Sequence, residues 1–547
     1  MANPLRFLAR RTLLSVADHV VTNPLIRWTW TGPGSDEELG GALAEFRPTD
    51  RETILEMMQG RYLLASKLVD THGVSPFSID VVHDDWLDDL HAFAWLRHFR
   101  DARNDEERRF ARTLALDWIG REGAFDRETW APSLCARRVL NWLRHLNILI
   151  EGASMEQAAT ITRSLSTQIQ SLKLRGTLAT DPVDALLAAI ALLGVALCND
   201  RSEDEIGARI RRVRRLLDQQ IDEDGLHMSR CAKIQIQILV ELITVRQAVR
   251  RSHEQFSDEF GETLDEMHRA LDAVSLGTGE PAYFNGTGQM PHDLIVAVQA
   301  QSPARARDTG TTGGYGRLIS GRSIVVADSG LVPPPEFSRN AHASALAFEF
   351  SHGRDLVVCN CGPAPAGLET NALLFRQGIA HSAPTINALS AAQIVQSGPL
   401  AGRLVPVGRP AEIEADAADH SLVVRAHGYD DRFGVTLERR LTLLAEGKTL
   451  VGQDRLVPRR NHPSGACAVR FHLAHQTEVE DGGDLLRLRL NSGAVWTFLW
   501  EGAEMRIEDS VRQSAYFGFH RIKQIVLDAH VADTSEVSWI FTLEEGQ

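Results

Sequence analysis

The sequence predicts an α+β protein of two large parts, a helical N-terminal part followed by a C-terminal antiparallel β-sandwich. Apolar residues recur at helical spacing over about three hundred positions, and from Gly313 onward they alternate in short runs. A change of period from about 3.6 to 2 marks a change of architecture within one chain. Residues 301–316 lack either period and are rich in Gly, Ser, Thr and Pro, so we expect a linker there.

Composition places the chain among ordinary globular proteins and narrows its partners. Its 547 residues are 44% hydrophobic and 24% charged, which is enough to bury a sizeable core. The net charge of −14 argues against nucleic-acid binding, because neutralising phosphates needs a basic surface. A local basic groove for an acidic sugar is still compatible with this total. The six scattered cysteines contain no CxxC pair, so we expect buried thiols instead of disulfides or a zinc site.

Residues 1–45 are expected to form an N-terminal extension. Their apolar positions predict an amphipathic helix that either docks onto the body or touches a membrane surface, and a Gly-rich loop follows. Asp18 and His19 interrupt the apolar run and no A-x-A site follows, so no secretory signal is recognised and we expect a cytoplasmic protein. The uncharged apolar run 185–198 is shorter than the ~20 residues of a membrane span, which predicts a buried core helix.

Amphipathic helices are predicted throughout residues 46–300. Apolar side chains recur three, four or seven residues apart within 86–94, 139–146 and 234–245, the pattern of helices that face a core. The connections between them are short and no fixed repeat length is present. This pattern alone fits a helix bundle and an α/α toroid equally well.

Residues 317–547 predict a large antiparallel sandwich. Short alternating runs separated by Gly, Asp and Asn turns are typical of such sheets. The clearest predicted strands are 421–426, 435–444, 485–490, 495–499, 523–528 and 537–542.

Several segments of both parts resemble one known family, the heparinase II/III-like polysaccharide lyases. The helical part carries DWLDDLHAFAWLRHF, APSLCARRVLNWLRHL and DEDGLHMSRCAKIQIQILVELITVR, and the β part opens with GGYGRLISGRSIVVADSG. The resemblance covers most of the chain, in the order of the family's motifs. It implies an α/α toroid, an incomplete helical barrel, joined to the sandwich. It also implies cleavage of an acidic, uronate-containing polysaccharide by β-elimination, without a cofactor.

Such a lyase must neutralise the substrate carboxylate, remove the neighbouring proton and protonate the leaving oxygen. His227 lies in the turn Asp224-Gly225-Leu226-His227, which resembles the family's DGGH, so we interpret it as catalytic. Arg230 follows three residues later as a candidate substrate ligand, and a purely structural helix start is the alternative. We expect His227 and His342 to face one cleft between the two parts.

Tyrosine is the family's second proton-transfer residue. Its position aligns near Ile234 here, so Tyr283 is the candidate substitute, with Tyr315 and Asn285 as candidate substrate ligands. A ring packed at the domain junction, with its hydroxyl paired, is the alternative for each tyrosine.

The segment Asn340-Ala-His342-Ala-Ser344 takes the place of the family's H.H.D. His342 is a candidate acid or base, and Arg339 and His381 are candidate substrate ligands. In some relatives a metal sits at positions that correspond to His342, Asn360 and His381. Because an amide replaces the carboxylate, we predict no tightly held metal.

These departures leave two functions open. The first, which we expect, is a lyase that cleaves an acidic polysaccharide by β-elimination. The second is a catalytically impaired relative that binds a glycan during polysaccharide assembly or export. The Asn-His that precedes the family's long apolar helix is replaced by Asp181-Pro182, which favours the second function. The retained His227, Arg230, His342 and His381 favour the first.

Overall fold

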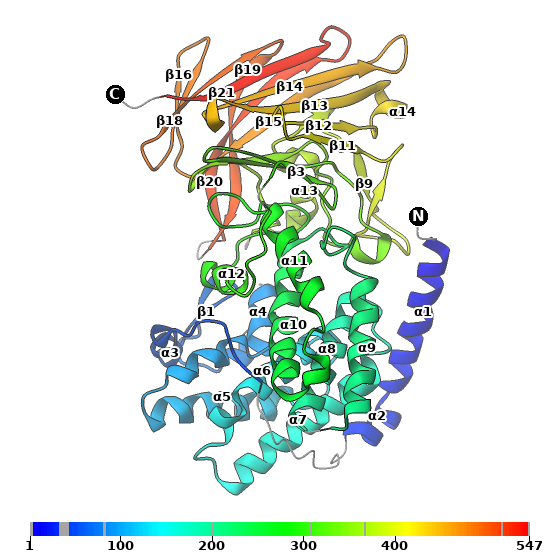
Figure 1. The fold of residues 1–547 in the computed structure, drawn as a ribbon, viewed down its shortest axis with the longest axis vertical. Coiled ribbons are helices and arrows are strands. Elements are labelled where there is room, and N and C mark those ends of the chain that lie inside the picture. Colours follow the sequence, from blue (N-terminus) through cyan, green and yellow to red (C-terminus); the bar gives the residue numbers. More distant parts are fainter. Residues whose placement is uncertain are drawn as a thin grey trace.

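A computed structural model gives the arrangement of the whole chain and describes residues 4–31, 43–79, 84–199, 201–306, 308–365, 368–515 and 518–544. The N-terminal half is helical and the C-terminal half forms packed sheets, and the two meet along one broad junction (Figure 1). Within the described ranges, no helix combines the length and apolarity needed to cross a membrane.

Two helices, α1 (Pro4–Val21) and α2 (Pro24–Thr31), precede the main helical body. Helix α1 runs along the outside of that body, and its N-terminal end lies near the sandwich (Figure 1). Asp18 accepts a hydrogen bond from Arg175 at 2.8 Å, which ties α1 to α7. Leu13 and Val16 are 69% and 57% exposed, so much of the helix's apolar surface is uncovered. The Gly-rich loop predicted after α2 lies almost entirely outside the described residues.

The helical body packs its longer helices side by side around an aromatic and aliphatic core. Phe93, Trp118 and Trp142 form mutual edge-to-face contacts with ring centroids 5.4–6.0 Å apart. The helices are α3 (Arg51–Met58), α4 (Asp84–His91), α5 (Asp105–Glu122), α6 (Pro132–Ile150), α7 (Met155–Arg175), α8 (Pro182–Cys198), α9 (Glu203–Asp218), α10 (Ala232–Ser252), α11 (Gly261–Ala273) and α12 (His292–Gln299).

The helical body also contains a hairpin that the apolar pattern did not predict. Strands β1 (Arg61–Leu64) and β2 (Lys67–Asp70) pair antiparallel across Ala65 and Ser66. Both turn residues have positive φ, as a two-residue hairpin turn of this hand requires. Neither residue is the Gly or Asn that usually marks such a turn, so the hairpin could not be predicted from its turn residues.

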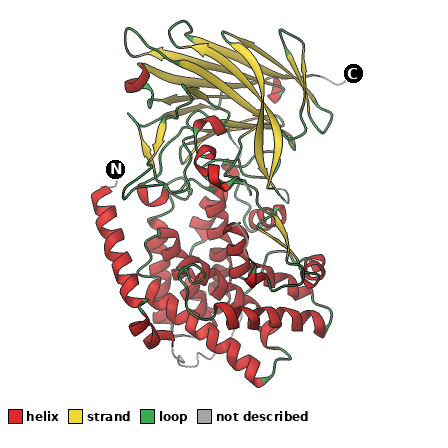
Figure 2. Ribbon diagram, turned by 180° about the vertical axis from the view of Figure 1, so that it is seen from behind, coloured by secondary structure: helices red, strands yellow, loops and turns green. Residues whose placement is uncertain are grey.

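The C-terminal half contains an eight-stranded and a nine-stranded antiparallel sheet (Figure 2), together with a small two-stranded sheet of β9 (Ala392–Ile394) and β10 (Leu404–Pro406). The eight-stranded order is β11-β12-β13-β14-β21-β18-β17-β16. In the nine-stranded sheet the order is β19-β20-β15-β7-β6-β5-β4-β3, and β8 also pairs with β15. Phe348 of the second sheet stacks on Trp539 of the first, with ring centroids 5.4 Å apart, so the two inner faces share one core.

In the eight-stranded sheet, the observed strands agree closely with the predicted runs. This sheet contains β11 (Glu412–Asp416), β12 (Ser421–Ala426), β13 (Val435–Leu444), β14 (Thr449–Pro458), β16 (Glu478–Asp481), β17 (Leu486–Arg489), β18 (Val495–Glu501) and β21 (Glu536–Leu543). The other sheet contains β3 (Gly310–Thr312), β4 (Tyr315–Ser320), β5 (Ser323–Asp328), β6 (Phe348–His352), β7 (Asp355–Cys359), β8 (Pro384–Ile386), β15 (Ala466–Leu473), β19 (Glu504–Ser514) and β20 (Gly518–His530). Strands β3 and β4 begin inside the linker expected at 301–316. The predicted domain boundaries themselves, near residues 45, 300 and 316, stay a prediction.

Candidate functional site

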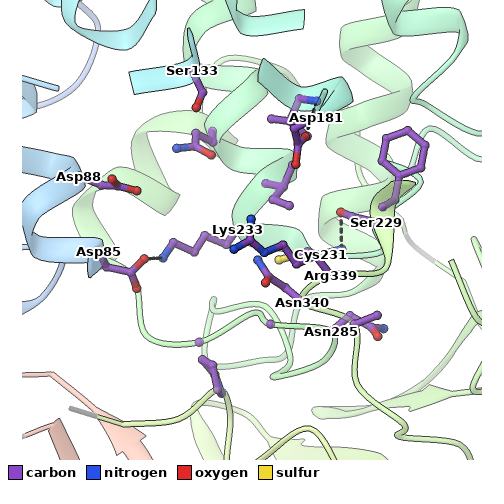
Figure 3. Close-up of a pocket in the computed structure, with 18 of the residues that line it drawn as sticks. Asp85, Asp88, Ser133, Asp181, Ser229, Cys231, Lys233, Asn285, Arg339 and Asn340 are labelled. Carbon is purple, nitrogen blue, oxygen red and sulfur yellow. Dashed lines mark hydrogen bonds and ion pairs between the residues drawn. The ribbon is translucent and has the colours of Figure 1, made fainter. Parts of the chain in front are cut away.

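A cleft of about 650 Å³ opens where the helical body meets the sandwich. The helical body contributes the starts of α8 and α10 and the side of α4, and the sandwich half contributes residues 336–342 (Figure 3). A junction between two halves is a common place for a ligand site, because it combines a rigid floor with groups from distant parts of the chain.

The start of α8 places two carboxyl groups in the cleft. Asp181 is the N-cap and accepts a hydrogen bond from the Val183 backbone amide at 2.9 Å, and Pro182 holds the first helical position. Asp184 lies one turn further on. Burial, and then the neighbouring charge of Asp181, raise the pKa of Asp184 to about 7.

The start of α10 places an ion pair across the cleft from α8. Lys233 contacts Asp85 of α4 at 2.7 Å, and the pair spans the open part of the cleft (Figure 3). Asp88 lies one turn beyond Asp85 on α4. Burial raises the pKa of Asp88 to about 6, against the opposing effect of Arg137. Ile234 lines the cleft beside Lys233.

The sandwich half closes the cleft with the segment that contains Arg339, Asn340 and His342. The ring of His342 is hydrogen-bonded through Nδ1 to Nε2 of His381 at 3.0 Å. Burial, followed by the proximity of His381 and Arg376, holds the pKa of His342 well below its usual range. His342 is therefore a neutral imidazole at physiological pH. Its backbone amide donates to Asn285 Oδ1 at 3.0 Å, which fixes the position of this segment.

His227 lies behind the wall of the cleft. Its side chain is fully buried, with Nδ1 2.7 Å from Ser229 Oγ and Nε2 3.3 Å from Gln220 Oε1. Burial lowers the pKa of His227 to about 3. The edge of the ring meets Phe337, and both Phe337 and Ser229 line the cleft. We expected both imidazoles in the cleft, and the structure corrects this: His342 lines it, and His227 supports residues that do.

Arg230 fastens the two halves together. Its guanidinium pairs with Asp328 at 2.7 Å and donates to the backbone oxygens of Gly313 and Leu331 at 2.8 and 2.7 Å. It also lies 4.1 Å from the ring centroid of Tyr315. The side chains of Arg230 and Asp328 are 4% and 0% exposed, so this guanidinium is committed to contacts within the protein.

The hydroxyl groups of both candidate tyrosines are also engaged. Tyr315 donates to the Arg230 carbonyl and accepts from Asn285 Nδ2, both at 2.6 Å. Tyr283 donates to Gln289 Oε1 at 2.9 Å, and Arg512 lies over its ring at 4.2 Å. Burial raises the pKa of both phenols above the ordinary value, although Arg230 and Arg512 oppose it. Neither ring lines the cleft.

The amide of Asn360 is used within the sandwich. Its Oδ1 accepts from the Ser382 backbone amide at 2.8 Å, and its Nδ2 donates to the Tyr283 carbonyl at 3.4 Å. His342 and His381 meanwhile bond to each other. Hydrogen bonds thus occupy His342 Nδ1, both ring nitrogens of His381 and the amide of Asn360, and no carboxylate is among the three side chains, so the set does not fit a metal ion.

The structure thus brings Asn285, Arg339 and His342 together in the cleft. The other predicted residues lie behind it, namely His227, Arg230, Tyr283, Tyr315 and His381. Sequence reasoning missed Asp88, Asp184 and Lys233, which belong to three separate helices. Each looks like an ordinary polar position of an amphipathic helix, and only their shared location marks them.

Comparisons with known proteins agree with this architecture. Residues 302–540 match the family model described as heparinase II/III-like, C-terminal. FtsZ-localized protein C of Caulobacter vibrioides is 28% identical over 480 residues, which covers 84% of this chain and 82% of that protein. The crystal structure of heparinase III superposes with a TM-score of 0.69 at 11% identity, covering 99% of this chain and 92% of that one. Heparan sulfate lyase HepC from Pedobacter heparinus gives 0.58 at 13% identity, covering 98% and 89%.

At 11–13% identity, the likeness to the two lyases concerns the fold. It confirms the predicted fold of a toroid joined to a sandwich. The apolar pattern of the helices alone had fitted a helix bundle and a toroid equally well. The matched C-terminal region extends from just before β3 into β21, so it includes nearly every strand of both sheets. Residues 302–540 are thus similar to the C-terminal domain of heparinase II/III-like proteins, and the chain as a whole shares the two-part fold of the two lyase structures.

Proposed function

We propose that the cleft binds an acidic glycan and does not cleave it by β-elimination. The observation that carries this proposal is the identity of the residues that form the cleft wall. Ile234, Asp181 and Asn340 occupy the positions where the family resemblance implies a tyrosine, an asparagine and a histidine. All three line the cleft. The site is thus retained as a cavity, with its proton-transfer groups exchanged for others.

The groups that remain are poorly suited to proton transfer from a sugar carbon. Among the described residues of the cleft wall, none is a tyrosine, and His342 is the one histidine. That imidazole bonds to His381, whose Nδ1 is in turn 2.8 Å from the Gln377 carbonyl. Tyr283 and Tyr315 are raised in pKa and lie outside the wall, which disfavours the phenolate that a basic tyrosine needs.

The charge of the cleft supports binding of a polyanion. Lys67 and Arg339 line it, and neither forms an ion pair with another described residue. The cleft wall also contains carboxyl groups. Because the pKa values of Asp88 and Asp184 are about 6 and about 7, these two groups are partly protonated near pH 7 and carry less than their full negative charge. The local potential is therefore more positive than a count of residues implies.

The 28% identical relative supports a role other than turnover. Its name describes a location with FtsZ and no reaction. The lyase structures that share the fold are named for glycosaminoglycan substrates, which supports a glycan as the ligand class for this cleft.

Calorimetric titration with a panel of uronate polysaccharides, followed in parallel by ultraviolet absorbance of unsaturated sugar ends, tests this proposal. We expect heat of binding from at least one polysaccharide and no rise in absorbance. Arg339→Ala should weaken the binding several-fold. Arg354→Ala, which removes the same charge from the exposed turn between β6 and β7, should leave it unchanged. A rise in absorbance would show that the protein is a lyase, and absence of binding to the whole panel would rule out a glycan site.

A further inference from the structure

A second cavity of about 440 Å³ lies beside the cleft in the helical body, and we call it the side chamber. It is bounded by the β1–β2 hairpin, α4, α10 and the segment that leads into α12. Six residues line both cavities: Asp85, Asp88, Arg137, Lys233, Gln237 and Gln289. The two cavities therefore adjoin, and the ion pair of Lys233 and Asp85 lies in the wall that they share.

The wall of the side chamber is more apolar than that of the cleft. It is formed by Leu63, Trp95, Ile236, Val240, Met290 and Leu294, among others. Trp95 and Ile236 are only 1% and 2% exposed, so they form a firm floor, whereas Leu63 is 37% exposed at the rim. Together they give the chamber an apolar patch beside its charged groups.

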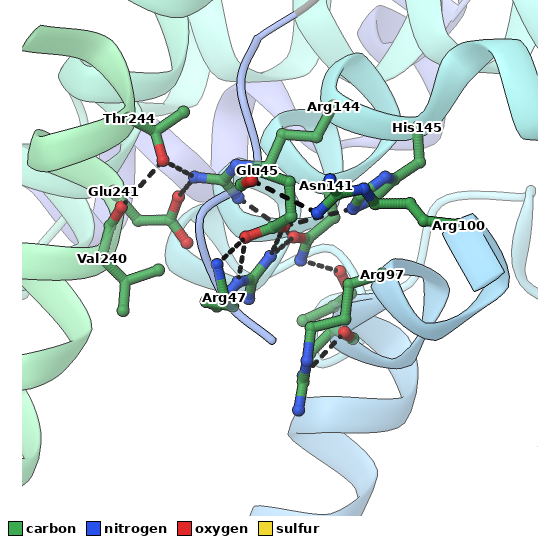
Figure 4. A network of polar contacts seen from close by, with 12 residues as sticks. Glu45, Arg47, Arg97, Arg100, Asn141, Arg144, His145, Val240, Glu241 and Thr244 are labelled. Atoms are coloured by element: carbon green, nitrogen blue, oxygen red, sulfur yellow. Dashed lines mark hydrogen bonds and ion pairs between the residues drawn. The ribbon is translucent and has the colours of Figure 1, made fainter. Parts of the chain in front are cut away.

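Charged groups in the side chamber are largely committed to one another. Arg47 and Glu241 line the chamber; Arg47 bonds to Glu45, and Glu241 bonds to Arg144, which also bonds to Thr244 (Figure 4). Arg97 donates to the backbone oxygens of Pro48 and Ala94. Because these groups already have partners, the chamber offers an ionic ligand little and an apolar one a preformed place.

We propose that the side chamber binds an apolar substituent of the glycan, such as an alkyl chain or an aromatic group joined to the sugar. This inference rests on the proposed binding of a glycan in the cleft. The sugar occupies the cleft, where Arg339 and Lys67 contact its carboxylate. The substituent passes Lys233 and Asp85 and packs against Leu63, Ile236 and Val240. The ligand class is thus an amphipathic glycoconjugate. Burial of the substituent supplies affinity because it removes apolar surface from water.

Three glucuronides that share the sugar and differ in the substituent test the proposal: methyl, 4-nitrophenyl and octyl β-D-glucuronide. We expect octyl glucuronide to bind the full-length protein at least 10-fold more tightly than methyl glucuronide in calorimetric titration. 4-Nitrophenyl glucuronide distinguishes an aromatic substituent from an alkyl substituent. Tighter binding than the octyl compound would assign the chamber to aromatic groups, and weaker binding would assign it to alkyl chains.

Variants localise the effect. Val240→Trp fills the chamber, and Leu63→Asn removes apolar wall at an exposed position where folding tolerates the change. Both should abolish the preference for octyl over methyl glucuronide. Arg339→Ala should weaken the binding of all three compounds alike. Leu499→Asn, the same exchange at an exposed position of β18, is the matched control and should change nothing.

Two results would overturn the inference and spare the proposed function: equal affinity for octyl and methyl glucuronide, or an octyl preference that survives in both chamber variants. Failure of the proposed function looks different. In that case octyl glucuronide binds to the protein and its binding is lost in the chamber variants, but the polysaccharides neither bind nor displace it.

Discussion

Arg230 shows how a residue that resembles a binding group is used to hold the protein together. Its guanidinium reaches from the helical body to Asp328 of the sandwich, and every contact described for it is internal. The sequence placed Arg230 three residues after His227 and correctly put both near the junction. It could not tell whether either side chain turns toward the cleft or away from it, since that depends on the positive φ of Arg230 and the packing of Tyr315.

Replacing Arg230 by Met should destabilise the protein strongly, because it leaves the buried carboxylate of Asp328 without its cation. The loss of one partner of a buried pair costs about 3–5 kcal/mol in unfolding free energy, measurable by urea denaturation. Arg487→Met breaks an exposed pair with Glu544 and serves as the control, with an expected cost of less than ~1 kcal/mol. Equal effects of the two variants would contradict a fastening role.

Asp184 should make glycan binding depend on pH. Its raised pKa of about 7 means that it gains negative charge as the pH rises from 6 to 8, and that charge repels an acidic ligand. We therefore expect affinity for a uronate polysaccharide to fall across this range, in the order of 3- to 10-fold, which corresponds to about 1 kcal/mol. In Asp184→Asn the decline should be much shallower. A decline of the same size in this variant would assign the effect to another group.

At the scale of elements, the sandwich strands were the most predictable part of the chain. Residues 421–426 and 435–444 form strands β12 and β13 with the predicted bounds. The reason is that side chains of a strand with one buried face must alternate, so the period is visible in the sequence. The order of the strands is not visible in this way. Strand β21 inserts between β14 and β18, far from its neighbours in sequence.

Gly452 in β14 is expected to be essential for that insertion. It lies opposite Trp539 of β21, and an added Cβ would overlap the indole ring. Gly452→Ala should therefore lower the unfolding free energy by about 1–3 kcal/mol through overpacking, as measured by thermal or urea unfolding. Gly310→Ala in β3 introduces the same methyl group into open space and should change stability little. A neutral Gly452→Ala would indicate that the two strands can separate.

At the scale of the whole molecule, buried neutral histidines couple stability to pH. Burial lowers the pKa of six of them to about 3 or 4: His91, His98, His145, His227, His381 and His472. Between pH 6.5 and 4 the unfolded chain binds protons that the folded protein does not. Each such group therefore removes stability as the pH falls, by up to ~1.4 kcal/mol per pH unit. The raised pKa values of Glu349, Asp184 and Asp88 act in the opposite direction but are fewer.

We therefore expect the melting temperature to fall steadily between pH 6.5 and 4.5, as followed by calorimetry. His91→Asn keeps an acceptor for the Trp118 indole, which donates to His91 Nδ1 at 3.1 Å, and removes one titrating group. Its melting temperature should be lower near neutral pH and should fall less steeply with acid. A melting temperature that stays constant or rises toward pH 4.5 would contradict neutral burial of these rings.

The sequence by itself determined the two-part architecture, the bounds of the clearest sandwich strands and the resemblance to the heparinase II/III-like proteins. These properties follow from the period of the apolar residues and from motifs that are contiguous in the chain. The tertiary structure decided which polar groups share a cavity. Asp88, Asp184, Lys233 and Arg339 come from four distant segments, and a side chain's direction depends on its neighbours in space. For the same reason, only the fold revealed that a second cavity with an apolar patch adjoins the cleft.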